Sequence, residues 1–128
     1  MKYYLNKTTD YQFDEAVDKI TLALKDVGFG ILTEIDIKTT LKNKLDVERK
    51  PYKILGACNP QFANKALSLE EKIGILLPCN VTIIETDEGK VDVSLMDPAV
   101  AMSVVDNPKL ESLAAVVREK LELALSNI

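Results

Sequence analysis

The chain has 128 residues, of which 47% are hydrophobic and 28% are charged, and this composition is typical of one soluble globular domain over residues 1–128. A net charge of −4 argues against a nucleic-acid partner, because that kind of binding depends on neutralising phosphates. The chain contains no histidine, which excludes serine–histidine and cysteine–histidine catalysis within one chain.

Residues 1–5 are predicted to form a first strand, because two tyrosines and a leucine stand close together there. A helix follows, and Thr9 with Gln12 three residues later matches a capping box at its start. Gly28 offers a left-handed end to this helix, since glycine adopts positive φ without strain. Between these signals, apolar residues recur at helical spacing: Phe13, Ala16, Val17, Ile20 and Leu24.

The pattern changes to a period of two over residues 29–38, which indicates a strand. Glu34, Asp36 and Lys38 alternate with isoleucines and are therefore expected to share one strand face. A short amphipathic helix is predicted for residues 39–45. Residues 38–53 carry six basic and two acidic side chains, a local charge of +6 − 2 = +4. This basic segment is interpreted either as a solvated surface or as a site that attracts a small anion or an acidic partner.

A third strand with strong apolar character is predicted for residues 52–58, and the turn sequence Asn59-Pro60 ends it. Residues 61–69 are helical in composition. Residues 73–84 are predicted to form one long β run with a bend at Pro78-Cys79-Asn80, because proline cannot donate to a strand ladder.

A turn containing Gly89 leads into a returning strand over residues 91–95, so these two strands form a hairpin. Asp97-Pro98 and Asn107-Pro108 each match an N-cap followed by proline at the first helical position. Together the elements predict an α+β fold with a mainly antiparallel sheet and helices packed on one face. A parallel βαβαβ sheet is the alternative, but the hairpin and the absence of a glycine-rich phosphate loop favour the first.

Two Cys-Asn pairs and their neighbours form the most individual part of the sequence. They belong to a set of segments consisting of residues 34–38 (EIDIK), Thr40-Leu41, residues 52–60 (YKILGACNP), Ala66-Leu67, residues 73–81 (IGILLPCNV) and Asp97-Pro98. Through these segments the chain resembles the domain-of-unknown-function 302 family over essentially its whole length. The resemblance implies a compact α+β domain with an antiparallel sheet, similar in outline to TATA-binding-protein-like folds and commonly dimeric. It implies no established activity.

Cys58 and Cys79 admit four interpretations. They can be buried small hydrophobic residues, or they can line a ligand pocket to which Asn59 and Asn80 donate hydrogen bonds. A redox or nucleophilic thiol would need activation by Lys53, by Lys38 or by a helix N-terminus. A four-ligand zinc site would need carboxylates or a second chain, because one chain supplies two thiolates and no imidazole, and no metal is predicted.

We expect the two Cys-Asn turns to lie together, because the strands that carry them are predicted to be sheet neighbours. Asp36 and Lys38 would lie beside them, as an ion pair that lines a cleft or as an ordinary surface pair. With the predicted cap Asp97, the candidate ligand-binding residues are Asp36, Lys38, Cys58, Asn59, Cys79, Asn80 and Asp97.

Two functional hypotheses follow. The first is a non-catalytic domain that binds or senses a small ligand near the two Cys-Asn turns, and the second is a thiol-dependent redox or transfer enzyme that uses Cys58 or Cys79. No cofactor is expected, and the expected partners are a second copy of the chain and a small molecule. The sequence lacks an apolar signal-peptide region and a run of about 20 apolar residues, which predicts a cytoplasmic location without a membrane partner.

Overall fold

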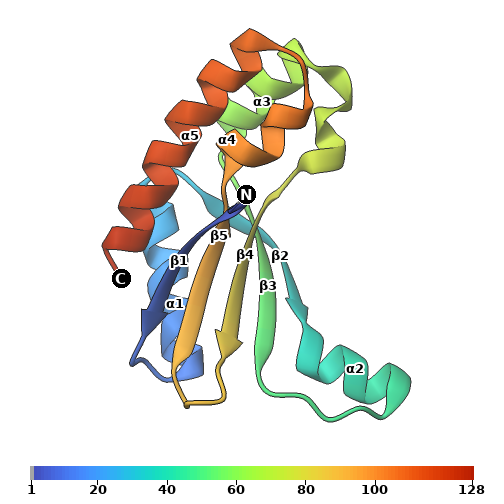
Figure 1. Ribbon diagram of the computed structural model, residues 1–128, viewed down its shortest axis with the longest axis vertical. Coiled ribbons are helices and arrows are strands. Elements are labelled where there is room, and N and C mark those ends of the chain that lie inside the picture. The colour runs from blue at the N-terminus through green and yellow to red at the C-terminus, as the bar shows by residue number, and fades with distance from the viewer. Residues whose placement is uncertain (1) are drawn as a thin grey trace.

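Five strands form one sheet in the order β1-β5-β4-β3-β2, and every pairing is antiparallel. The computed structural model describes residues 2–128 (Figure 1). The predicted α+β class is therefore confirmed, and the parallel alternative is wrong. The strands are β1 (Tyr4–Thr9), β2 (Gly30–Asp36), β3 (Tyr52–Cys58), β4 (Cys79–Glu85) and β5 (Val91–Met96).

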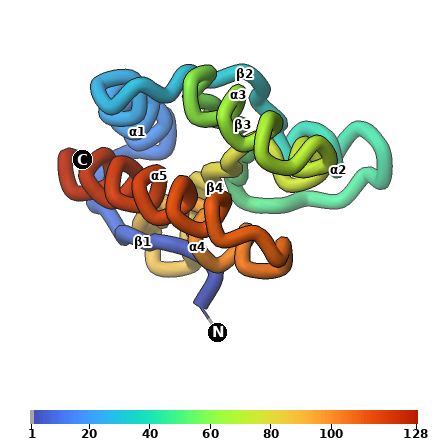
Figure 2. Tube along the Cα trace, turned by 90° about the horizontal axis from the view of Figure 1, so that it is seen from above, coloured from blue at the N-terminus to red at the C-terminus, as the bar shows by residue number. Residues whose placement is uncertain are grey.

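Two long helices, α1 (Phe13–Asp26) and α5 (Pro108–Ser126), cover one face of the sheet, whereas α2 (Ile37–Leu45) lies on the other side (Figures 1 and 2). The shorter helical elements gather beyond one end of the sheet, under the first half of α5 (Figure 1). These elements are α3 (Pro60–Leu69), the 3₁₀ turn η1 (Glu71–Leu76), α4 (Pro98–Ala101) and the 3₁₀ turn η2 (Met102–Val104).

Apolar side chains form two separate clusters, because the helices pack on the sheet at one end and on each other at the other. The larger cluster joins α1, the sheet and the second half of α5, and its fully buried residues include Ile20, Leu24, Leu55, Ile83, Leu95 and Leu121. The smaller cluster lies among α3, η1, η2 and the start of α5, and it consists of Ala66, Ile73, Met102, Leu110 and Ala114. Different helices and strands form the two clusters, and the candidate functional site lies at the boundary between them.

The predicted ends of the helices are mostly confirmed. Asp97 and Asn107 accept hydrogen bonds from backbone amides as N-caps of α4 and α5, each followed by proline. Gly28 has a φ of 92° just after α1, and Gly89 has a φ of 78° in the β4–β5 turn. The predicted capping box is wrong, because Thr9 belongs to β1 and its hydroxyl donates to the carbonyl of Val91 at 2.9 Å.

Three strand predictions are wrong in extent. The first strand, predicted over residues 1–5, is β1 at Tyr4–Thr9; residues 2 and 3 are not in a strand, and residue 1 lies outside the described part of the chain. Residues 71–76 form the 3₁₀ turn η1 instead of the start of a long strand, and the Leu77–Pro78 peptide bond that follows is cis. In a strand Ile73 and Ile75 would share a face, but Ile73 is 1% exposed and Ile75 is 83% exposed. The strand predicted over residues 29–38 ends at Asp36, so Lys38 lies in α2 and does not share a strand face with Glu34 and Asp36.

Candidate functional site

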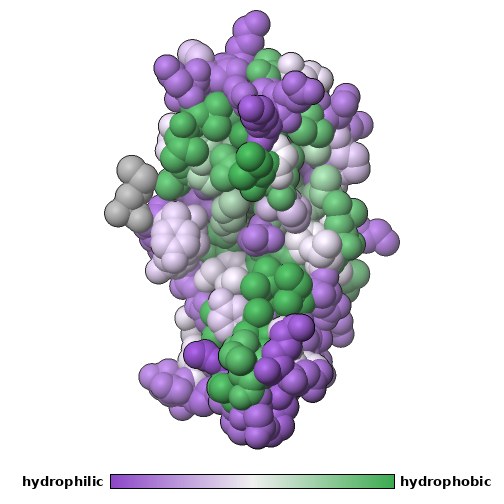
Figure 3. All heavy atoms as spheres, turned by 90° about the vertical axis from the view of Figure 1, so that its right-hand side faces the viewer, coloured by the Kyte–Doolittle hydropathy of each residue, from purple (hydrophilic) through white to green (hydrophobic). Residues whose placement is uncertain are grey.

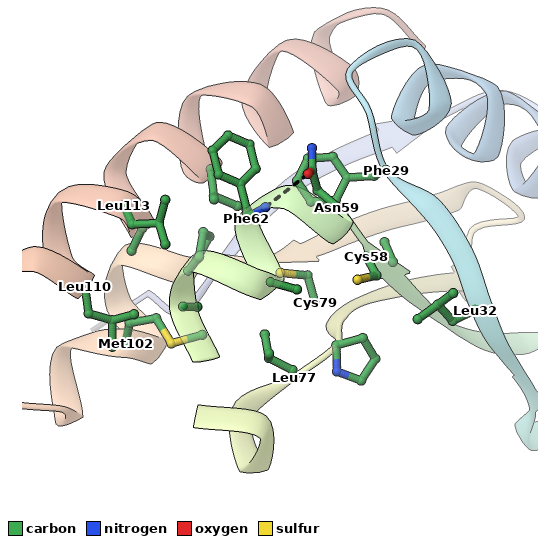
Figure 4. Close-up of a pocket in the computed structure, with 17 residues that line it drawn as sticks. Phe29, Leu32, Cys58, Asn59, Phe62, Leu77, Cys79, Met102, Leu110 and Leu113 are labelled. Atoms are coloured by element: carbon green, nitrogen blue, oxygen red, sulfur yellow. Dashed lines mark hydrogen bonds between the residues drawn. The ribbon is translucent and has the colours of Figure 1, made fainter. Parts of the chain in front are cut away.

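A cavity of about 290 Å³ lies at the boundary between the two apolar clusters (Figure 4). Its walls come from the ends of β3 and β4, from α3, from the first half of α5 and from the segment around α4. None of the seventeen lining residues is charged, and Asn59 is the only one with an amide side chain. The lining residues are Phe29, Leu32, Ala57, Cys58, Asn59, Phe62, Ala63, Ala66, Leu77, Pro78, Cys79, Pro98, Met102, Leu110, Leu113, Ala114 and Val117.

Both cysteines reach this cavity from neighbouring strands. Ala57 pairs with Cys79, so Cys58 is one position out of register with Cys79 and alternation directs it to the other side of the sheet. Both side chains still line the same space because Cys58 ends β3 and Cys79 begins β4, where the sheet no longer separates its two faces. Both are free thiols. The two cysteines therefore lie close together as predicted, because both stand at the end of the sheet.

Leu32 forms part of the cavity wall through an irregularity in β2. Ile31 pairs with Ala57 and Thr33 pairs with Gly56, so Leu32 is left without a partner in a β-bulge. A bulge turns one side chain out of the regular alternation. Leu32 is 68% exposed while it lines the cavity, and Cys58 and Asn59 are half-buried. These residues place an opening of the cavity between β2 and the start of α3.

Asn59 has a structural role as well as a place in the wall. Its Oδ1 accepts hydrogen bonds from the amides of Gln61 at 3.1 Å and Phe62 at 3.2 Å, which makes it the N-cap of α3 (Figure 4). Its amide nitrogen lies against Gly28, where a Cβ atom would stand only 2.8 Å away. Asn59 thus holds α3 in place over the cavity with its side-chain oxygen.

The two thiols differ in environment. Burial raises the pKa of the Cys79 thiol from its ordinary value of 9.0 to about 11, and the nearby Cys58 thiol adds a smaller contribution in the same direction. Cys79 is therefore a neutral thiol at physiological pH. This protonation state suits contact with an apolar ligand and disfavours nucleophilic attack.

We expect Cys58 to react with a disulfide reagent such as 5,5′-dithiobis(2-nitrobenzoate) in the native protein and Cys79 to resist it. In the Cys58→Ser variant the remaining thiol should react about 100-fold more slowly at pH 8 than after unfolding, because a pKa raised by two units lowers the thiolate fraction about 100-fold. Stability should also fall as pH rises from about 9 to 11, since the folded state holds this proton more tightly than the unfolded chain. Rapid reaction of native Cys58→Ser would contradict the assignment of Cys79 as a buried neutral thiol.

Four of the sequence-predicted residues do not line the cavity. Asp36 is the N-cap of α2 and lies six positions along β2 from Gly30, the partner of Cys58, roughly 20 Å away at about 3.3 Å per residue. Lys38 is exposed on α2. Asn80 is exposed on the opposite face of β4 from Cys79.

Asp97 is next to the cavity-lining Pro98 but points elsewhere. Its Oδ1 accepts from the amide of Ala99 at 3.0 Å, and its Oδ2 accepts from Nε of Arg118 on α5 at 2.9 Å. The hydrogen bond to Asp97 raises the pKa of Arg118 above its ordinary value. Asp97 therefore fastens α4, and with it one wall of the cavity, to α5.

Three of the six basic side chains in the basic segment form ion pairs with acidic side chains. Lys42 lies 2.7 Å from Asp46 and 2.6 Å from Glu48. Lys50 contacts Asp87 at 2.5 Å, and Lys53 contacts Glu34 at 2.8 Å. These ion pairs use half of the positive charges that an external anion would need, which favours the solvated-surface interpretation of this segment.

Within residues 2–128, no three histidine, cysteine, aspartate or glutamate side chains are grouped so that they could hold a metal ion. None of the helices in that part of the chain is both long and apolar enough to cross a membrane.

Most of the cavity wall could not be predicted from the sequence. Phe62 and Ala66 on α3, and Leu110, Leu113 and Val117 on α5, stand in helical stripes that predict core packing. A stripe indicates which side of a helix is buried, but it does not indicate whether the facing stripe fills the space between them. The position of these residues on a cavity could not be predicted from their spacing.

Comparison with known proteins agrees with the fold. The chain is similar to a solved structure described as the crystal structure of uncharacterized conserved protein DUF302 from Bacillus stearothermophilus, with a TM-score of 0.93 and 24% identity over 99% of this chain and 98% of that one. At this identity the likeness shows the fold alone. No curated protein matches the chain. The family model described as domain of unknown function DUF302 matches residues 5–128, and the chain belongs to that family.

Proposed function

We propose that this domain binds a small, mainly apolar molecule in the cavity between β3, β4, α3 and α5, without catalysing a reaction on it. The observation that supports this proposal most directly is a cavity of about 290 Å³ with no charged lining residue. Its volume is near the lower end of the range of about 300–1,000 Å³ common for ligand sites. It is about twice the ~150 Å³ of an engineered apolar cavity that holds benzene.

The chemistry of the wall selects the ligand. Contact with phenylalanine, leucine, methionine and alanine side chains contributes roughly 25 cal/mol for each Å² of apolar ligand surface removed from water. A charged group placed inside would lose its hydration without gaining a partner, so the buried part of the ligand is neutral. The thiols of Cys58 and Cys79 are weak hydrogen-bonding groups and add polarisable contacts.

Binding is a better proposal than thiol chemistry. The Cys79 thiol has a pKa of about 11 and is buried, which disfavours it as a nucleophile. No lysine or arginine lines the cavity to stabilise a Cys58 thiolate. A redox or transfer enzyme remains the alternative that thiol reactivity tests.

Filling part of the cavity is expected to weaken binding. Ala63 lines it from α3, and an Ala63→Phe side chain would occupy part of the space that the ligand needs. With the neutral fluorescent probe N-phenyl-1-naphthylamine, we expect saturable fluorescence enhancement in the wild type and at least about tenfold weaker binding in Ala63→Phe, a difference of about 1.4 kcal/mol.

The matched control is Ala115→Phe, which adds the same ring to an exposed position of α5 away from the cavity wall. This control should bind the probe like the wild type, and circular dichroism should show both variants folded. Equal probe affinity in Ala63→Phe and the wild type would place the probe elsewhere and would overturn the proposal.

We also propose that the chain forms a homodimer through the sheet face that α1 and α5 leave uncovered. That face carries Ile35, which is 47% exposed, together with the half-buried Tyr52, Ile54 and Ile84. Seen from the side of α2, hydrophilic side chains gather at both ends of the molecule and hydrophobic ones lie between them (Figure 3). An apolar centre with a polar rim is the usual anatomy of a two-fold interface.

Light scattering at micromolar concentration is expected to give twice the mass of the 14.2 kDa chain. Ile54→Lys should give the monomer mass, because the new ammonium would be buried against the partner's same face. A monomer mass for the wild type would rule out the dimer and would leave the ligand proposal unaffected.

A further inference from the structure

A second hollow lies outside the contact between α3 and α5 and, unlike the cavity, has charged side chains in its wall. It is an open groove lined by two lysines, two serines and an asparagine, with no carboxylate in its wall. The lining residues are Asn64, Lys65, Ser68, Leu69, Lys109, Ser112, Leu113 and Val116. Leu113 also lines the apolar cavity, so this one side chain is a wall of both hollows.

The two lysines of the groove are without ion-pair partners among residues 2–128, unlike Lys42, Lys50 and Lys53. Lys65 lies beside the cavity wall, because its Nζ is 6.0 Å from the centre of the Phe62 ring, and Phe62 lines the cavity. Phe62 projects from α3 toward α5, the helix that carries Leu113 (Figure 4). A positive charge therefore stands next to an uncharged cavity at the seam between these helices.

The serine hydroxyl groups of the groove already donate to backbone carbonyls, so the lysines are its main hydrogen-bond donors. The hydroxyl of Ser68 donates to the carbonyl of Asn64 at 2.8 Å, and that of Ser112 donates to the carbonyl of Pro108 at 3.2 Å. Glu111 is exposed near Lys109 in sequence but is not part of the groove wall. An anion in the groove would meet two ammonium groups and no lining carboxylate.

We propose that the ligand is a single-chain amphiphile whose hydrocarbon tail fills the cavity and whose carboxylate lies in the groove between Lys65 and Lys109. This inference rests on the proposed binding function and adds the class of ligand. The tail reaches the groove past Leu113, which is half-buried and has to turn aside to join the two hollows. If each methylene takes about the ~30 Å³ of a water molecule in the liquid, the cavity holds a tail of up to about ten carbons.

Calorimetric titration with octanoate and with the uncharged 1-octanol tests the role of the head group. We expect Lys65→Gln/Lys109→Gln to weaken octanoate binding about tenfold and to leave octanol binding within about twofold, since partly exposed charge pairs contribute modestly and additively. The effect on octanoate should shrink in 0.5 M salt, because added ions screen exposed charges. Lys25→Gln/Lys44→Gln, with the same loss of charge at exposed positions on α1 and α2, should change neither affinity.

Amide chemical shifts give a second measurement. Octanoate, but not octanol, should shift the amide signals of the groove residues that do not line the cavity, whereas both ligands should shift those of Cys58 and Cys79. These groove residues are Asn64, Lys65, Ser68, Lys109 and Ser112. Unchanged octanoate affinity in the double lysine variant, or shifts confined to the opening at Leu32 and Cys58, would overturn this inference while octanol binding still supports an apolar site. If neither compound binds the wild type, the proposed function itself fails.

Discussion

Replacing Gly56 by alanine is expected to lower the free energy of unfolding by about 2–3 kcal/mol, because a methyl group has no room there. Gly56 lies within β3, paired with Thr33 on one side and Asn80 on the other. A Cβ atom would stand 2.2 Å from Oγ1 of Thr33 and 2.7 Å from Cγ of Pro78. Pro78 lines the cavity, so the clash presses on the wall of the proposed site as well as on the sheet.

Urea denaturation followed by circular dichroism measures this loss, and Gly30→Ala is its control. Gly30 lies in the adjacent strand β2, and a Cβ atom there meets nothing within 4 Å. The control should change stability by less than about 0.5 kcal/mol. Adding Thr33→Ala to Gly56→Ala should recover part of the loss, since it removes the closest contact. Equal urea midpoints for Gly56→Ala and Gly30→Ala would show that β2 and Pro78 move to make room for the methyl group without loss of stability.

The elements whose ends are marked by local chemistry could be predicted from the sequence. Asp97 and Asn107 precede proline and cap α4 and α5, and Gly28 ends the turn after α1 with positive φ, because each of these signals acts within a few residues. The alternation along β5 also survives in the structure, with Val91, Val93 and Leu95 buried. Such features depend on the backbone and its nearest neighbours, so no knowledge of the distant chain is needed.

The features that depend on long-range packing could not be predicted. The run Ile73–Leu77 is apolar enough for a strand, yet it turns as η1 so that Ile73 packs with Met102 and Leu110 from the other end of the chain. The bulge at Leu32 depends on the register of β2 against β3, and no residue type in the sequence indicates it. Periodicity also does not report the space left between α3 and α5.

The same distinction divides the candidate site. Cys58, Asn59 and Cys79 were correctly expected to be close, because their strands are neighbours joined through α3. Asp36 and Lys38 are also predicted to lie beside them, but antiparallel pairing places the end of β2 next to Lys53, at the far end of β3 from Cys58. A strand's direction relative to its neighbour therefore decides which of its ends can join a site.

Replacing Asp97 by alanine is expected to destabilise the fold by about 2–3 kcal/mol, which exceeds the loss of an ordinary exposed cap. Asp97 is 5% exposed, and both of its carboxylate oxygens accept hydrogen bonds, one from Ala99 and one from Arg118. Alanine would leave the amide of Ala99 unpaired and would remove the hydrogen bond that Arg118 of α5 donates to Asp97. Because Pro98 and Met102 line the cavity directly after this cap, binding of N-phenyl-1-naphthylamine should weaken together with stability.

Two further variants separate the cap from the link to α5. Asp97→Asn keeps an oxygen for the amide of Ala99 but loses the charge that faces Arg118, so its stability should fall between those of the wild type and Asp97→Ala. Asp36→Ala removes the N-cap of α2, a helix with no buried residue, and should cost at most about 1 kcal/mol without changing probe affinity. Thermal and urea denaturation measure the stability of both variants. If Asp36→Ala and Asp97→Ala lose the same stability, Asp97 acts as a cap alone, and the fastening of the cavity wall to α5 through Arg118 has no energetic consequence.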